Sequence, residues 1–190
     1  MPSEDDHKFI SRVGKTKKFL KAMELEVSPE TVERYTKLLI GISEDRESEK
    51  DISKGIFPSR KFSGMIIEKD IPIFSYCEHH VLPWFGQVHI GYISHERILG
   101  ISKFTRLVGY YSSGLTIQED VTAAITTYFE SRISSDVIVV IEAIHTCKVA
   151  RGVENPFSRS LTLDARGVFK SDTGPRVEFF SSIGSTRSQW

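Results

Sequence analysis

Cysteine, net charge and long apolar runs are all scarce in this chain of 190 residues. Its two cysteines, Cys77 and Cys147, are too few for the disulfide framework of a small secreted domain. Lys and Arg together number 25, as do Asp and Glu, so the basic excess of a duplex DNA binder is absent. No stretch approaches the roughly 20 apolar residues that span a membrane, and the polar N-terminus has no apolar signal segment. We therefore expect a cytoplasmic protein with reduced thiols and no nucleic-acid or membrane partner.

The overall composition is that of an ordinary globular chain, with 39% hydrophobic and 26% charged residues. The polar residues 1–12 are expected to fray, and the lysine-rich segment 13–23 suits a short surface helix. Ser28-Pro29-Glu30 predicts a helix start, with Ser at the N-cap and Pro at the first helical position. Residues 44–54 are charged and aperiodic, which predicts a loop.

Strand-like and helix-like segments then follow in blocks. Alternating or continuous apolar residues predict strands, and wider apolar spacing predicts helices. The predicted strands are 63–77, 86–94, 136–150 and 158–170, and the predicted helices are 102–113, 116–132 and 176–183. Because these elements do not alternate as βαβ units, we predict an α+β fold with an antiparallel sheet.

Metal-binding side chains are concentrated in C-E-H-H, residues 77–80, and in H-T-C, residues 145–147. If the second motif lies on a strand, His145 and Cys147 point to the same face, because strand side chains repeat every two residues. Two thiolates and one imidazole would then converge from two segments. Three protein ligands plus water is the pattern of a catalytic zinc site, whereas a structural site closes with four.

Five side chains compete for three ligand positions. Both cysteines are expected to bind, and His80 pairs better with Cys77 than its neighbour does, because residues three apart converge in a tight turn. Glu78, His79 and His145 would then lie near the metal, where they can move protons. A closed structural site that uses both histidines is the alternative.

Four motifs in this order resemble GTP cyclohydrolase I. They are C-E-H-H-V-L-P-W-F-G-Q-V-H-I-G-Y-I, L-G-I-S-K-F-T-R-L-V, T-I-Q-E and I-H-T-C-K-V-A-R-G-V, and the similarity runs from about Ser28 to Phe180. The resemblance implies a tunnelling fold (T-fold): a four-stranded antiparallel sheet with helices on one side, preceded by N-terminal helices. It also implies a decamer with active sites at subunit interfaces. We accordingly expect a polar N-terminal segment at 1–27, a catalytic domain at 28–182 and a polar tail at 183–190.

The resemblance further implies conversion of GTP and water to formate and 7,8-dihydroneopterin triphosphate, with Zn²⁺ as cofactor. By motif, the zinc ligands are Cys77, His80 and Cys147, and the catalytic histidines are His79 and His145. The implied substrate-binding residues are Glu78, Ser102, Lys103, Arg106, Gln118, Glu119, Arg151 and Arg34. Among these, Gln118 and Glu119 match the pair that recognises guanine.

Three positions depart from the family pattern. Thr31 replaces a common arginine, and Gly114 and Thr116 replace an arginine and a glutamine. These departures leave open a changed substrate, or a catalytically silent assembly protein that binds a nucleotide. Sister enzymes of the same fold fit less well. A pterin synthase would use three histidines for its zinc, and a nitrile reductase would use an unligated cysteine.

Overall fold

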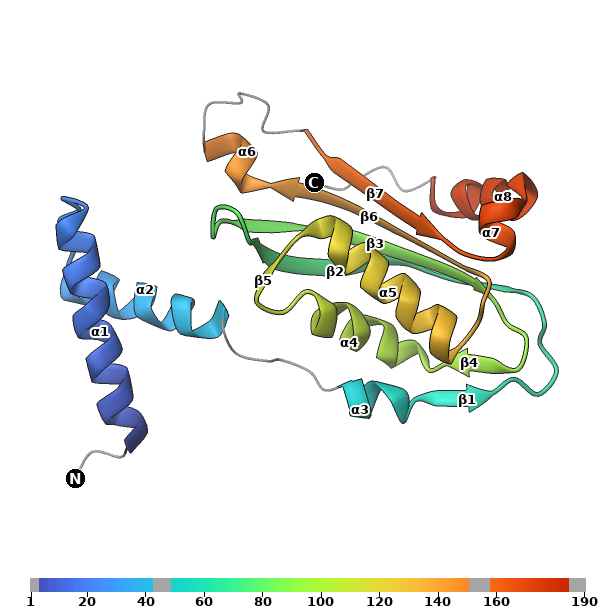
Figure 1. The fold of residues 1–190 in the computed structure, drawn as a ribbon, viewed down its shortest axis with the longest axis horizontal. Coiled ribbons are helices and arrows are strands. Elements are labelled where there is room, and N and C mark those ends of the chain that lie inside the picture. Colours follow the sequence, from blue (N-terminus) through green and yellow to red (C-terminus); the bar gives the residue numbers. More distant parts are fainter. Residues whose placement is uncertain (1–3, 43–48, 151–157, 185–190) are drawn as a thin grey trace. The chain divides into compact units, whose positions relative to one another are not determined.

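The computed structural model describes residues 4–42, 49–150 and 158–184. The chain divides into two compact units, Met1–Glu44 and Asp45–Trp190. Figure 1 shows the elements of both units. The sequence predicts that the catalytic domain starts at residue 28, whereas the compact units meet between residues 44 and 45. The predicted domain boundary stays a prediction.

The N-terminal unit is a pair of helices, α1 (Glu4–Ala22) and α2 (Pro29–Ile42). The prediction that residues 4–12 fray was wrong, because α1 already begins at Glu4. Its first turn carries three acidic residues, which interact favourably with the positive end of the helix dipole. The predicted start of α2 is confirmed, with the Thr31 backbone N–H donating to Ser28 Oγ at 3.3 Å.

The second unit is built on a five-stranded sheet in the order β5-β2-β3-β6-β7. Its long strands are β2 (Met65–Cys77), β3 (Pro83–Ile93), β6 (Val137–His145) and β7 (Ser160–Ala165). They pair antiparallel, which confirms the predicted four-stranded sheet. The structure adds β5 (Leu115–Thr116), which pairs in parallel with the end of β2, so α5 begins two residues later than predicted.

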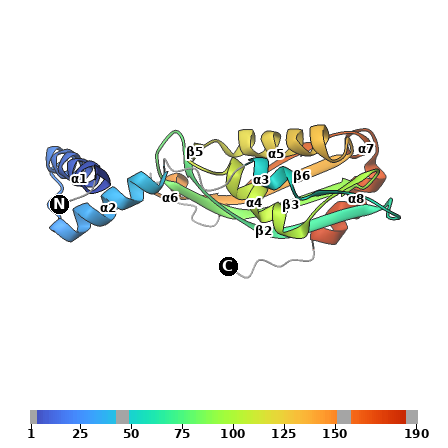
Figure 2. The same cartoon turned by 90° about the horizontal axis from the view of Figure 1, so that it is seen from below.

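Helices α4 (Ile101–Tyr111) and α5 (Gln118–Arg132) cover one face of the sheet. The core between them holds apolar side chains from alternate positions of β6, such as Val139 and Ile141, and aromatic rings such as Phe104 and Phe129. The other face is covered at one end by α7 (Val168–Ser171) and α8 (Thr173–Ile183) (Figure 2). The sheet is therefore packed on both faces at that end.

Three short elements lie outside this sheet. Strands β1 (Ile56–Pro58) and β4 (Arg97–Leu99) form a separate antiparallel pair. Helix α3 (Glu49–Ser53) contradicts the loop predicted for residues 44–54, of which 44–48 lie outside the described residues. Ile52 explains the helix, since its side chain is fully buried in the core. No helix among the described residues has the length and apolar character to cross a lipid bilayer.

Candidate metal centre and active site

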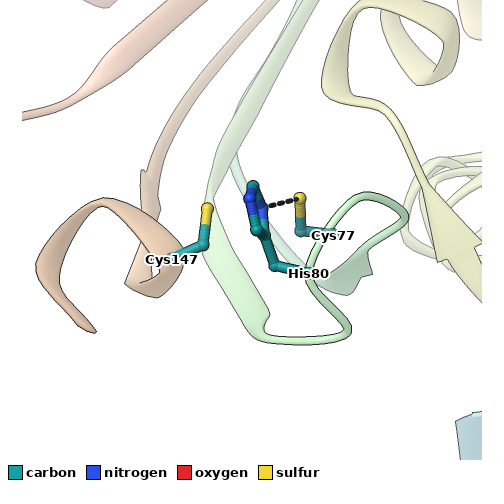
Figure 3. Close-up of side chains that lie close together, drawn as sticks. All are labelled: Cys77, His80 and Cys147. Carbon is teal, nitrogen blue, oxygen red and sulfur yellow. Dashed lines mark hydrogen bonds between the residues drawn. The ribbon is translucent and has the colours of Figure 1, made fainter. Parts of the chain in front are cut away.

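Cys77, His80 and Cys147 come together at one end of the sheet. Cys77 is the last residue of β2, His80 lies in the turn before β3, and Cys147 lies in the short helix α6 (Thr146–Ala150). One ligand atom from each lies within 4.8 Å of the others. Figure 3 shows the three side chains pointing toward one another. The predicted convergence of two distant thiols and one imidazole is therefore present.

The turn after Cys77 is closed by its own backbone. The N–H groups of His80 and Val81 both donate to the carbonyl oxygen of Cys77, at 3.3 and 2.8 Å, and Cys77 N–H donates to Leu82 O at 2.8 Å. Val81 has a φ of 54°, in the left-handed region that β-branched residues avoid. Such strain costs about 1–3 kcal/mol and is characteristic of functional sites. The tight turn is what returns His80 to the Cys77 thiol.

The route by which Cys147 reaches the cluster differs from the prediction. Strand β6 ends at His145, which pairs with Trp84, and the chain turns into α6 at the next residue. The Thr146 hydroxyl donates to Pro83 O at 2.7 Å and fixes this turn. The argument that His145 and Cys147 share a strand face was therefore wrong, since Cys147 is helical.

The three donors fit a zinc ion. Cys77 Sγ and His80 Nδ1 are 3.5 Å apart. Ligand atoms around a tetrahedral zinc lie roughly 3.6–3.8 Å apart, given bond lengths of about 2.1 Å to nitrogen and 2.3 Å to sulfur. Both thiols are free of disulfides and almost fully buried, with residue exposures of 6% and 5%. Two thiolates and one imidazole form a donor set that suits zinc.

Glu78 and His79 lie at the exposed rim of this turn. His79 Nδ1 is 3.9 Å from Cys77 Sγ, and the two histidine rings of the turn are 6.1 Å apart. Within the described chain, His79 is not part of the group that could hold a metal. The choice of His80 over His79 as a metal ligand stays a prediction.

His145 lies next to the metal cluster in sequence but is held by different partners. Its ring stacks on Trp84, with centroids 5.3 Å apart and planes 9° apart, and its Nε2 is 2.8 Å from Gln118 Oε1. Burial lowers the pKa of His145, a nearby Glu119 carboxylate opposes this effect, and Lys148 adds to it. The site therefore favours a neutral imidazole near pH 7.

Gln118 begins α5 and is 2% exposed. Its Nε2 lies 3.0 Å from Ile141 O, 3.2 Å from Ser160 O and 3.0 Å from Thr162 Oγ1. The amide thus bridges α5 to the two strands behind it, and its oxygen reaches His145. The neighbouring Glu119 is exposed at the same helix start. The predicted guanine contacts of both residues stay predictions.

The residues predicted to bind the triphosphate lie on α4, which has Gly100 as its N-cap and no side-chain capping bond. Ser102 and Arg106 are exposed one helical turn apart. Lys103 Nζ donates to the Asp51 carbonyl oxygen at 3.0 Å. In the part of the chain that the structure describes, no hydrogen bond or ion pair joins these three residues to the metal cluster.

Two predicted arginines are not connected to this site by the structure. Arg34 lies on an exposed part of α2, in the N-terminal unit, and Arg151 lies outside the described residues.

Two of the residues that depart from the family pattern have local structural roles. Thr116 Oγ1 is 2.7 Å from Ser75 Oγ, and Gly114 has a φ of 81°, where glycine is favoured. Both residues support the segment that pairs with the end of β2.

Sequence reasoning missed Trp84 and Thr162, which hold His145 and Gln118 in place. Trp84 is fully buried, and its pairing with His145 across β3 and β6 became visible only once the strand register was known. The nearest sequence signal was its position directly after the C-E-H-H motif. Thr162 gave no signal, since it sits in a strand far from either motif.

Comparisons with known proteins identify the family of this chain. The profile of a family described as GTP cyclohydrolase I matches residues 7–184. A GTP cyclohydrolase 1 of Deinococcus radiodurans is 41% identical over 136 residues, covering 71% of this chain and 62% of the relative. One of Wolinella succinogenes is 39% identical over 160 residues, covering 84% of each chain.

The human GTP cyclohydrolase 1 is 44% identical over 122 residues, which cover 64% of this chain and 49% of that protein. Among solved structures, an archaeosine synthase QueF-Like protein in the apo form aligns with a TM-score of 0.47 and 15% identity. That alignment covers 56% of this chain and 97% of the other. The chain therefore spans between about half and five sixths of the length of these curated relatives.

Proposed function

The chain belongs to the GTP cyclohydrolase I family, and on this basis we propose that it converts GTP and water to formate and 7,8-dihydroneopterin triphosphate. The observation that carries the proposal is the convergence of Cys77, His80 and Cys147, with His145 held two residues from the last of them. The overall reaction hydrates C8 of guanine, opens the imidazole ring and releases C8 as formate. The ribose then opens and rearranges, and the pyrazine ring closes.

Cys77, His80 and Cys147 would hold a zinc ion. Bound there, zinc would supply Lewis acidity and bring the pKa of water close to neutral pH. The burial of both thiols supports this assignment, because it shields the ligands from solvent. Their number supports it too, since three protein ligands leave one position of a tetrahedral ion for a non-protein ligand.

His145 is proposed to take up a proton and deliver it to guanine N7, since its neutral form has no further proton to give. C8 of a purine is a poor electrophile, and protonation of N7 makes it a better one. An imidazole can perform this transfer near neutral pH. His79, exposed at the rim of the same turn, is proposed to move the proton at the ribose ring oxygen. Glu78, also on this rim, would contact substrate.

Guanine recognition is proposed for Glu119 at the start of α5. Its carboxylate can accept hydrogen bonds from guanine N1–H and the 2-amino group. Its charge raises the pKa of His145, which supports a place for the base beside that ring. Adenine lacks both donors and would leave the carboxylate unpaired, so GTP should be preferred strongly over ATP.

The triphosphate is proposed to bind Ser102, Lys103 and Arg106, with Arg151 and Arg34 as further contacts. The uncapped start of α4 supports this, because free N–H groups and the helix dipole attract anions. Lys103 would have to leave the Asp51 carbonyl oxygen to reach a phosphate. The active sites are proposed to lie between subunits of a homodecamer in the cytoplasm, feeding pterin and tetrahydrofolate synthesis.

The direct test combines metal analysis with a turnover assay. Purified protein should contain close to one zinc per chain, and incubation with GTP should release formate together with a pterin that fluoresces after oxidation. Omission of GTP and replacement by ATP are the controls. Zinc-replete protein that releases no formate from GTP would contradict the proposal.

A second candidate is a divergent enzyme acting on another nucleoside triphosphate. The departures at Thr31, Gly114 and Thr116 favour it, because the family has an arginine at the first two positions and a glutamine at the third. Turnover of a panel of purine triphosphates would separate the two candidates. Full zinc with binding but no turnover of any of them would indicate a silent assembly protein.

A further inference from the structure

The hydrogen bonds around Gln118 determine which end of its amide faces His145. On one side, the amide meets two backbone carbonyl oxygens, Ile141 O at 3.0 Å and Ser160 O at 3.2 Å. Carbonyl oxygens only accept, so the group facing them must be the amide NH₂. If the amide were turned over, its oxygen would face the carbonyl oxygens of Ile141 and Ser160, so that three acceptors would meet without a hydrogen between them. Oε1 therefore faces His145 Nε2, at 2.8 Å.

Two threonine hydroxyls fix the same orientation independently. Thr122 donates its single O–H to the backbone oxygen of Gln118 at 2.8 Å. The Thr162 hydroxyl, 2.7 Å from Thr122 Oγ1, must then be the donor between the two. Thr162 Oγ1 is left to accept from Gln118 Nε2, at 3.0 Å. Both hydroxyl hydrogens of this network are thereby assigned, with the amide oxygen pointing out of it.

An amide oxygen cannot donate, so the ring nitrogen that it meets must carry a proton. We propose that Gln118 is a positioning residue that holds His145 as the Nε2–H tautomer, and thereby makes Nδ1 the nitrogen that gives and takes the proton. Among the described residues, no hydrogen bond to Nδ1 is found. The consequence for catalysis rests on the proposed function, whereas the tautomer itself does not.

Trp84 completes the restraint on the ring. The stack, with planes 9° apart, fixes the plane of the imidazole, and the bond to Gln118 fixes its rotation within that plane. Trp84 and Gln118 are both buried, with exposures of 0% and 2%, and they come from β3, the strand paired with β6, and from α5, which covers one face of the sheet. The reacting nitrogen would therefore be preorganised before substrate binds.

This role differs from the guanine contact expected for Gln118. Both amide hydrogens and the amide oxygen already have partners inside the protein, and the side chain is enclosed. A contact with guanine would have to break one of these bonds in a buried position, which costs free energy. Recognition of the base then falls to Glu119. A positioning role predicts a defect in kcat, and a binding role predicts a defect in KM.

The tautomer can be read directly by ¹⁵N NMR on metal-loaded protein that carries ¹⁵N in its histidine rings. The signals of His145 are identified by their loss in His145→Gln. We expect a protonated Nε2 and an unprotonated Nδ1 in the wild type. In Gln118→Met, which keeps the size but replaces the amide oxygen with a weakly accepting thioether, the two tautomers should become mixed.

Thr162→Val is the matched control, because it removes one bond to the same amide and leaves Oε1 in place. It should keep the Nε2–H tautomer and most of the turnover. For Gln118→Met, we expect kcat for GTP to fall by about tenfold or more, while KM stays within about twofold.

A wild-type His145 protonated at Nδ1, or present as a mixture, would overturn the proposal. So would a Gln118→Met enzyme in which KM rises and kcat is unchanged, since that outcome assigns Gln118 to the base. If Gln118→Met fails to fold, the wild-type spectrum still decides. If no GTP is turned over at all, the proposed function fails while the tautomer remains measurable.

Discussion

The metal cluster and the environment of His145 adjoin each other but are built in different ways. Cys77, His80 and Cys147 stand on a strained turn and on a helix of five residues. His145 ends a central strand, and its partners Trp84 and Gln118 are buried side chains of the core. The metal cluster brings its donor atoms together from short segments. The environment of His145 instead holds one side chain through contacts with two buried residues.

The difference separates two requirements of the proposed active site. Ligands to an ion can come from short segments, because metal–ligand bonds themselves draw the donors together. A group that transfers a proton has no such bond to hold it, so the surrounding protein must fix its orientation and tautomer. Mutations should therefore affect metal content in the first region and turnover alone in the second.

The largest effect is expected for Cys147→Ser. Loss of one of two thiolates weakens zinc binding, so both zinc content and GTP turnover should fall to background. Metal analysis of the purified protein and a formate assay measure the two. Thr146→Ser is the neighbouring control, since it keeps the hydroxyl that bonds Pro83 O. A Cys147→Ser protein with full zinc and full activity would remove Cys147 from the ligands.

His145→Ala should show that zinc binding and turnover depend on different residues. Because His145 is not among the proposed ligands, zinc content should be unchanged, while kcat falls by about 10²- to 10⁴-fold, the usual contribution of a general acid. His95→Ala is the control, since His95 lies in the loop at the far end of β3 and pairs with Asp136. Loss of zinc from His145→Ala would mean that His145 binds the metal.

Val81→Gly tests the strain in the turn. Glycine accepts a positive φ, so the substitution should raise the free energy of unfolding by about 1 kcal/mol, after allowing for the greater freedom of glycine in the unfolded chain. Val81→Ala is the matched control, because alanine loses the side chain but keeps the strain. Chemical unfolding of metal-loaded protein measures both. Equal stability changes in the two variants would show that strain in the turn is negligible.

The smallest effect concerns His89, on the sheet face away from α5. Burial lowers the pKa of His89 below its ordinary value of 6.5, and the charges of Asp70 and Glu142 only partly oppose this. Just below pH 6.5 the unfolded chain therefore binds a proton that the folded chain does not. Stability should fall as the pH drops through this window, by at most about 1.4 kcal/mol per pH unit.

His89→Gln should reduce that loss, because Gln does not titrate in this pH range. Gln can still accept from the Asp70 N–H, which donates to His89 Nδ1 at 3.1 Å, so the local structure is kept. The slope of unfolding free energy against pH, between pH 6.5 and 5, is the measurement. His95→Gln serves as the exposed control. An unchanged slope in His89→Gln would show that His89 is not the group responsible.

Much of the metal cluster was predictable because it depends on local patterns. The spacing of Cys77 and His80 within one turn, and the scarcity of other cysteines, were sufficient to predict that these side chains converge with Cys147. The antiparallel sheet followed from the order of the apolar segments. The structure of α6 was not predictable in this way, because the strand's apolar residues run on through Val149 while its pairing stops at His145.

The support of His145 could not be read from the sequence. Trp84 and Thr162 act through strand register, which no local pattern specifies. Helix α3 was missed because a single buried residue, Ile52, outweighs a charged and aperiodic segment. In each case, a contact between distant segments determined the outcome.

The central claim is that Cys77, His80 and Cys147 bind one zinc ion that keeps a position open to a non-protein ligand. Zinc X-ray absorption spectroscopy of the purified protein tests it most directly. We predict two sulfur neighbours at about 2.3 Å, one imidazole and one light non-protein atom. Two sulfurs with two imidazoles would indicate a closed structural site, and a spectrum without sulfur would contradict the ligand assignment altogether.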